Sequence, residues 1–194
     1  YRVMFLSEQS QIEKLKALKQ QGYHRLLADN LAHIQIGKEL GFTIHAGAYL
    51  NCVNSYSAKQ LADFGVTDIT LSFEAELKKI NAMIAERPLG IIVYGYIPLM
   101  IMKNCPIKAK HKCKDCNGTK ALVDRKGVAF RVICNHRKYS EVLNSNPLYM
   151  ADRMKELRNC SFATLYFTIE TQAQVERVIR QYQNGDAPKG EFTR

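Results

Sequence analysis

Short apolar segments alternate with amphipathic segments along the first half of the chain, at intervals of about 20 to 25 residues. We expect the apolar segments to be strands, at residues 1–6, 24–28, 42–45, 66–71 and 89–94. Helices are expected between them, such as one for which Asp29-Asn30 supplies the N-cap and one over 74–86 that places Leu77, Ile80 and Ile84 on one face. Apolar strands flanked by amphipathic helices are typical of a parallel sheet that is buried on both faces. The pattern therefore predicts an α/β fold, either doubly wound or a barrel.

The second half of the chain is less regular. Residues 121–123 and 128–132 are predicted to form a hairpin around the turn 124–127, which ends in glycine. Residues 147–157 are predicted to form a helix, because Pro147 suits a first turn and the apolar residues Leu148, Ala151, Met154 and Leu157 share a face. A strand within 161–169 and a helix that begins with the capping box Thr171–Gln174 follow.

These segments suggest a division of the chain into four parts. Residues 1–102 are predicted to be βα units, 103–146 a Cys-rich basic insertion with a hairpin, 147–183 closing βα elements, and 184–194 a linker or tail. With 194 residues and 46% hydrophobic residues, the chain can bury one sizeable core.

Four of the six cysteines, Cys105, Cys113, Cys116 and Cys134, follow the spacing C-x7-C-x2-C-x17-C. Thiolates are soft ligands, and four of them can hold a tetrahedral zinc ion or an iron-sulfur cluster. His136 could replace one thiolate in a zinc site. The spacing alone does not choose between zinc and an iron-sulfur cluster. Free cysteines without a secretory signal indicate a reducing, cytoplasmic setting.

The same region carries most of the positive charge. Residues 103–138 hold eleven Lys or Arg residues against two Asp residues, which accounts for +9 of the net charge of +10. A basic run is commonly a solvated face, but it also suits a negatively charged cluster and an anionic partner such as RNA.

Candidate substrate-binding residues lie where the expected strands end, because ligands of parallel α/β folds bind at those ends. They are Asn51, Glu74, Tyr94 and Glu170, and we add Arg125 from the basic hairpin. The chain has no G-x-S-x-G, H-E-x-x-H, G-x-x-x-x-G-K-[ST] or G-x-G-x-x-G motif, so a serine or zinc peptidase is unsupported and no catalytic residue is identified. The longest apolar stretch, residues 89–102, is too short to span a bilayer, so we expect no membrane partner.

Several ordered motifs resemble one known family. They are Asn51-x-x-Asn54-Ser55, Tyr94-Gly95-x-x-Pro98-Leu99-Met100, Asn104-Cys105-Pro106-Ile107, the C-x2-C pair, Asp124-Arg125-Lys126-Gly127-x-x-Phe130-x-Val132, Leu143-Asn144-Ser145-x-Pro147-Leu148 and Leu165-Tyr166-Phe167-Thr168-x-Glu170. In these motifs the chain resembles the collagenase-like peptidases of family U32 over nearly its whole length.

The resemblance implies a partial TIM-like (β/α) barrel with an inserted Cys-rich hairpin module. It also implies a 4Fe-4S cluster held by Cys105, Cys113, Cys116 and Cys134. Relative to the family, the first barrel strands are absent, and residues 191–194 resemble the start of a longer segment. We therefore expect this chain to be part of a longer protein, whose remainder is its partner.

Three functions follow as hypotheses. Characterised relatives are similar to factors for oxygen-independent hydroxylation of RNA or of a quinone precursor, and the basic region favours such an iron-sulfur enzyme acting on RNA or a related anion. The family label instead implies a collagenase-like peptidase with a structural metal site. The third hypothesis is a zinc-stabilised binding module.

Overall fold

The computed structural model describes residues 8–109, 112–113, 116, 119–135, 139–188, 190 and 192–193, and it forms two compact units. The first unit comprises the chain up to residue 92 together with 153–165, and the second comprises 93–152 and the chain from 166 onward. The strand expected at residues 1–6 lies outside the described residues, as does His136.

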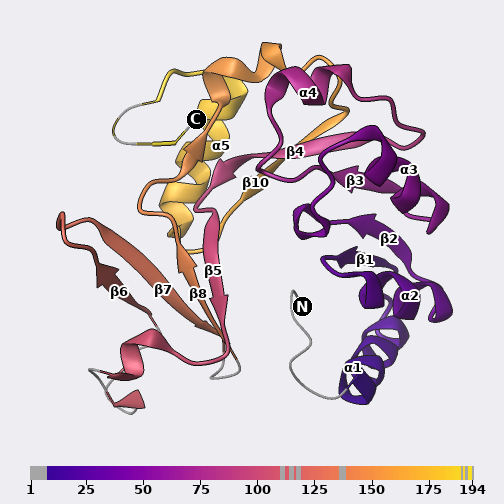
Figure 1. Cartoon of the computed structure of the whole chain (residues 1–194), viewed down its shortest axis with the longest axis horizontal. Coiled ribbons are helices and arrows are strands. Elements are labelled where there is room, and N and C mark those ends of the chain that lie inside the picture. Colours follow the sequence, from indigo (N-terminus) through magenta and orange to yellow (C-terminus); the bar gives the residue numbers. More distant parts are fainter. Residues whose placement is uncertain are drawn as a thin grey trace. The chain divides into compact units, whose positions relative to one another are not determined.

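The first unit alternates helices and strands (Figure 1). Its elements are α1 (Glu8–Gln20), β1 (Arg25–Ala28), α2 (Leu31–Glu39), β2 (Thr43–Ala46), α3 (Ser55–Asp63), β3 (Asp68–Thr70), α4 (Leu77–Ala82) and most of β4 (Leu89–Gly95) and β10 (Phe162–Tyr166). Strands β1, β2, β3 and β4 pair in parallel, each with the next. The predicted α/β fold with a parallel sheet is confirmed.

The sheet runs in the order β1-β2-β3-β4-β10. Among the described strands it does not close, so a complete TIM-like barrel stays a prediction. Its core is aliphatic and includes the fully buried side chains of Ile44, Val66, Ile69 and Leu71. Asn30 accepts a hydrogen bond from the His33 backbone, which confirms that Asn30 is the N-cap of α2.

Helix α4 is shorter than the sequence predicts. It ends at Ala82, and Ile84, expected on its apolar face, is 83% exposed. Three tertiary hydrogen bonds explain the early end: the Ile84 backbone donates to Ser55 Oγ, and Asn159 Nδ2 donates to the carbonyl oxygens of Ile80 and Met83. A longer helix would use the Ile84 amide and the Ile80 and Met83 carbonyls in its own hydrogen bonds. Because these groups have tertiary partners, the helix ends about one turn early.

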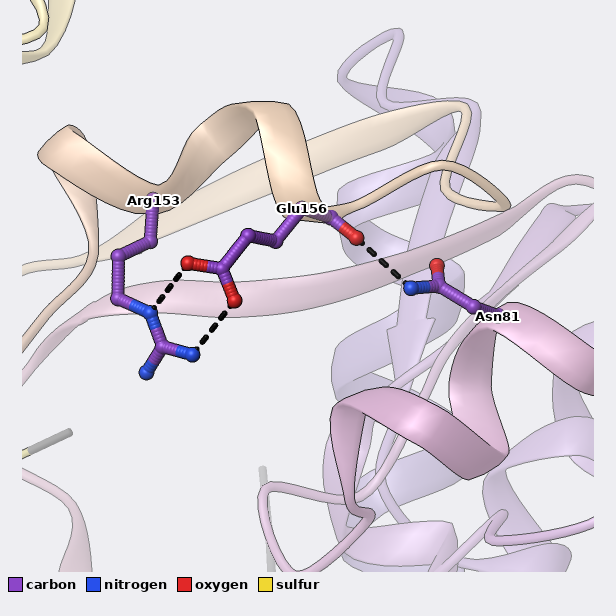
Figure 2. A network of polar contacts seen from close by, with 3 residues as sticks. All are labelled: Asn81, Arg153 and Glu156. Carbon is purple, nitrogen blue, oxygen red and sulfur yellow. Dashed lines mark hydrogen bonds and ion pairs between the residues drawn. The ribbon is translucent and has the colours of Figure 1, made fainter.

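Figure 2 shows how the returning segment is fixed to α4 within the first unit. Asn81 Nδ2 donates to the carbonyl oxygen of Glu156 at 2.7 Å. The Glu156 carboxylate accepts two hydrogen bonds from Arg153, at 2.7 Å from Nε and 2.6 Å from Nη2. This bidentate geometry holds the short 3-10 helix η4 (Ala151–Glu156) in shape, while Asn81 links that helix to α4.

The second unit contains a four-stranded antiparallel sheet in the order β5-β8-β7-β6 (Figure 1). Its elements are β5 (Pro98–Met102), the 3-10 helix η2 (Pro106–Ala109), β6 (Thr119–Val123), β7 (Ala129–Asn135), β8 (Tyr139–Leu143), β9 (Leu148–Tyr149), α5 (Gln172–Asn184) and the ends of β4 and β10. Strands β6 and β7 pair around the turn that the sequence predicts, where Asp124 Oδ1 accepts from the backbones of Lys126 and Val128.

Residues 147–157 do not form the helix that their apolar spacing predicts. Residues Leu148 and Tyr149 are strand β9, which pairs with β4 through Tyr94, and the turns that follow are 3-10. The Tyr149 backbone donates to the carbonyl oxygen of Thr193, a partner far away in the sequence. Long-range backbone pairing therefore overrides the local apolar pattern. No helix in the described part of the chain is long and apolar enough to cross a membrane.

Burial of His33 in α2 predicts a loss of stability in acid. The side chain is 3% exposed, and burial lowers its pKa to about 4. An unfolded chain with a pKa near 6.5 takes up the proton first, so the stabilisation is complete above about pH 6.5 and is lost as the pH falls toward 4. Between pH 7 and 5, we expect His33 to remove roughly 2 kcal/mol from the free energy of unfolding.

Urea unfolding at several pH values checks this prediction. The His33→Leu variant should show a smaller loss of stability between pH 7 and 5 than the wild type. The exposed His24 serves as the control, since His24→Gln should keep the wild-type slope. Equal acid slopes for the wild type and His33→Leu would contradict the prediction.

Candidate functional site

A cavity of about 550 Å³ lies within the second unit, and we call it the Tyr94 pocket. Its wall combines aromatic rings, two arginines, one carboxylate and two carboxamides, contributed by β4, β7, β9, α5 and the segment after α5. The lining residues are Tyr94, Tyr96, Arg131, Pro147, Tyr149, Ile169, Glu170, Thr171, Gln174, Arg177, Val178, Gln181, Pro188 and Phe192. A pocket of this volume is within the range that small ligands occupy in proteins.

Tyr94 stands at the end of β4 inside a cluster of aromatic rings. Its ring centroid lies 5.3 Å from that of Phe167, 6.3 Å from Tyr182 and 6.4 Å from Tyr149. The neighbouring Gly95 allows this packing, because a Cβ there would overlap the carbonyl oxygen of Tyr166 and its φ of 138° disfavours other residues.

The tyrosine hydroxyls of this cluster are fixed by long-range bonds. Tyr182 donates to the carbonyl oxygen of Val93 and accepts from the Met150 backbone, and Tyr149 donates to the carbonyl oxygen of Asp186. Burial raises the pKa of Tyr94, Tyr149 and Tyr182, so all three stay neutral at physiological pH. They supply rigid rings, not acid-base groups.

Glu170 shapes the loop between β10 and α5. Its Oε2 accepts hydrogen bonds from the backbones of Thr168 at 2.7 Å and Ile169 at 2.9 Å. Its Oε1 is buried and accepts no hydrogen bond of normal geometry among the described residues. Burial is the largest cause that raises the pKa of Tyr94, and the negative charge of the nearby Glu170 is the second. Glu170 therefore orders the loop beside the pocket.

Arg131 on β7 and Arg177 on α5 bring positive charge to the pocket. Neither guanidinium has an ion-pair or hydrogen-bond partner among the residues that the structure describes. Two guanidiniums stand against one carboxylate in the wall, and Oε2 of that carboxylate is already bound by backbone donors, so the lining carries a net positive charge. The pocket therefore favours an anionic group.

The structure brings together two of the five candidate substrate-binding residues, Tyr94 and Glu170. Arg125 lies in the exposed turn of the β6–β7 hairpin, and Asn51 and Glu74 belong to the first unit. Sequence reasoning missed Arg177 and Tyr149. Arg177 could have been found from the spacing of Gln174, Arg177, Val178 and Gln181, which share one helical face. Tyr149 was missed because residues 147–157 were predicted to form a helix.

The four candidate metal ligands also lie in the second unit. Cys105 packs against a small core made by Ile107, Val132 and Val142. Cys134 is on β7 opposite Ser140, and the Cys116 backbone donates to the carbonyl oxygen of Cys113. In the described residues, no three His, Cys, Asp or Glu side chains gather closely enough to hold a metal.

The donor set nevertheless has the chemistry that a soft metal centre needs. None of the four cysteines is in a disulfide, three are half-buried and Cys113 is exposed. The other two cysteines differ, since burial raises the pKa of both Cys52 and Cys160 and disfavours their thiolates. The same stretch of sequence carries exposed cations, including Lys103, Lys108, Lys112 and Lys126. Four thiolates in a basic setting fit an iron-sulfur cluster and also fit zinc.

Comparison with known proteins identifies one family. The family model for peptidase family U32 matches residues 5–184. Neither a curated protein nor a solved structure matches the chain significantly.

The role of Glu170 predicts how the loop responds to mutation. Removing the acceptor in Glu170→Ala should speed hydrogen exchange at the Thr168 and Ile169 amides about tenfold, because each loses a charge-assisted hydrogen bond. Glu170→Gln keeps an acceptor oxygen and should have a smaller effect.

Hydrogen exchange followed by NMR gives the measurement. Glu176→Ala, on the exposed side of α5, removes the same charge without touching the loop and should leave both amides unchanged. Unaltered exchange in Glu170→Ala would show that the loop does not depend on this carboxylate.

Proposed function

The chain belongs to peptidase family U32, and from this premise we propose that it is an iron-sulfur protein that acts in oxygen-independent hydroxylation of RNA or a related anionic substrate. The observation that carries the proposal is the set of four cysteines, none of them in a disulfide, within a basic stretch of one unit. The same unit contains a pocket whose lining carries a net positive charge.

Cys105, Cys113, Cys116 and Cys134 are the residues that would hold the cluster. A bound cluster would supply one-electron chemistry. The surrounding lysines and arginines reduce the electrostatic cost of gathering four thiolates, and they attract a polyanion by the same charge. Such thiols stay reduced in a cytoplasmic setting, where we place the protein.

The residues of the Tyr94 pocket have separate roles in this proposal. The rigid rings of Tyr94 and Tyr149 orient a bound group and exclude water from one side of it. Arg131 and Arg177 bind its negative charge, and Glu170 holds the loop in place through backbone amides. We also propose that further strands complete the sheet as a TIM-like barrel in the longer protein.

The family description favours a second function, that of a peptidase. In this alternative we propose a collagenase-like peptidase whose metal site is structural. The sequence motifs of serine and zinc peptidases are absent, so the group that would attack a peptide bond is not identified. A zinc-stabilised binding module would use the same four thiols without chemistry of its own.

Metal content separates these functions. Protein purified and reconstituted without oxygen should hold about four irons per chain, with a broad absorption band near 400 nm. Cys116→Ala should lose most of the iron and the band. Cys160→Ala should keep both, because Cys160 is a half-buried thiol outside the set.

The opposite results have clear meanings. One zinc ion per chain without colour would contradict the iron-sulfur proposal and favour the structural metal site. Equal iron loss in Cys116→Ala and Cys160→Ala would show that the assignment of ligands is wrong.

A further inference from the structure

We propose that the Tyr94 pocket binds a single nucleoside monophosphate unit, with the base against the tyrosine rings and the phosphate on Arg131 and Arg177. The inference rests on the proposed function in one respect, because an RNA substrate would present such a unit as an unstacked nucleotide. Free nucleotides offer the same chemistry.

The charges of the pocket select an anion over a cation. Aromatic rings with a carboxylate are typical of sites for ammonium groups. Here Glu170 is the single carboxylate against two guanidiniums, its Oε2 already accepts from two backbone amides and its Oε1 is buried. The two guanidiniums have no described partner, and a guanidinium is a planar donor that matches the oxygens of a phosphate.

The rings select a planar group beside that anion. Tyr149 cannot swing freely, because its hydroxyl donates to the carbonyl oxygen of Asp186 at 3.0 Å. Phe192 lies against it with ring centroids 6.0 Å apart, and both rings line the pocket. Stacking on such fixed rings contributes about 1–3 kcal/mol per base in single-strand binding.

The polar edge of a base also finds suitable partners. Gln174 uses Oε1 to accept from the Thr171 backbone, which leaves its Nε2 group for a ligand. Gln181 lies about two helical turns further along the same face of α5 and contributes a second carboxamide to the wall. Carboxamides donate and accept hydrogen bonds, as base edges do.

The far wall is held in place by backbone pairing. Thr193 accepts from the Tyr149 backbone at 3.1 Å and donates to the carbonyl oxygen of Pro147 at 2.9 Å. This pairing positions Phe192 beside Tyr149, so the pocket exists before a ligand arrives. A preformed wall of this kind lowers the entropic cost of binding.

Calorimetry on the full chain, purified without oxygen, tests the inference. The four nucleoside 5′-monophosphates are the probes, with the matching nucleosides and inorganic phosphate as partial ligands. At least one monophosphate should bind more tightly than its nucleoside and than phosphate. Arg177→Gln should weaken that binding about tenfold, since one charge-assisted contact is lost.

Arg180→Gln is the matched control, because Arg180 is also an exposed arginine of α5 but does not line the pocket. It should change affinity less than twofold. Phe192→Ala tests the ring wall. It should weaken binding of the monophosphate more than it weakens binding of inorganic phosphate. Circular dichroism confirms that each variant is folded.

Absence of monophosphate binding in the millimolar range, or equal effects of Arg177→Gln and Arg180→Gln, would overturn the inference. A single-stranded RNA oligonucleotide separates this failure from failure of the proposed function. Salt-dependent RNA binding without monophosphate binding overturns the pocket inference alone. Monophosphate binding that depends on Arg177, without RNA binding, supports the pocket and contradicts RNA as the substrate.

Discussion

The hydroxyl of Tyr182 joins three segments of the second unit, and the pocket depends on it. It belongs to α5, donates to the Val93 carbonyl at the end of β4 and accepts from the Met150 backbone just after β9. A half-buried hydroxyl that both donates and accepts fixes these segments against one another. The rings of Tyr94 and Tyr149 pack around this point, so the aromatic wall and the arginine on α5 have defined positions.

The two chemical features of the second unit have different origins. The four thiols and the basic residues around them are local in sequence, between residues 103 and 138. The pocket instead collects residues from the end of β4, from β7, from α5 and from the segment after it. Both features favour a negatively charged ligand, the first through its many lysines and arginines and the second through two guanidiniums. A single polyanion that carries aromatic rings would satisfy both, which is the physical basis for proposing RNA.

Local signals allowed part of this structure to be predicted. The N-cap Asn30, the capping box Thr171–Gln174 and the turn after Asp124 each depend on neighbours within four residues, and the structure confirms them. The early end of α4 and the conversion of residues 148–149 into a strand depend on Asn159 and Thr193, whose contacts no local pattern reveals. Strand β8 also escaped prediction, because its buried residues include the polar Ser140 and Glu141. Tyr94 and Glu170 could be found because they follow expected strands, whereas only the spacing of residues along α5 pointed to Arg177.

The measurement that tests the central claim most directly is nucleoside analysis of RNA by mass spectrometry. RNA is taken from cells grown without oxygen that produce the full-length protein containing either this chain or its Cys116→Ala variant. The account predicts a nucleoside heavier by one oxygen atom that is present with the wild type and lost with the variant. Identical nucleoside profiles from the two cultures, together with peptide cleavage by the purified wild type, would contradict it.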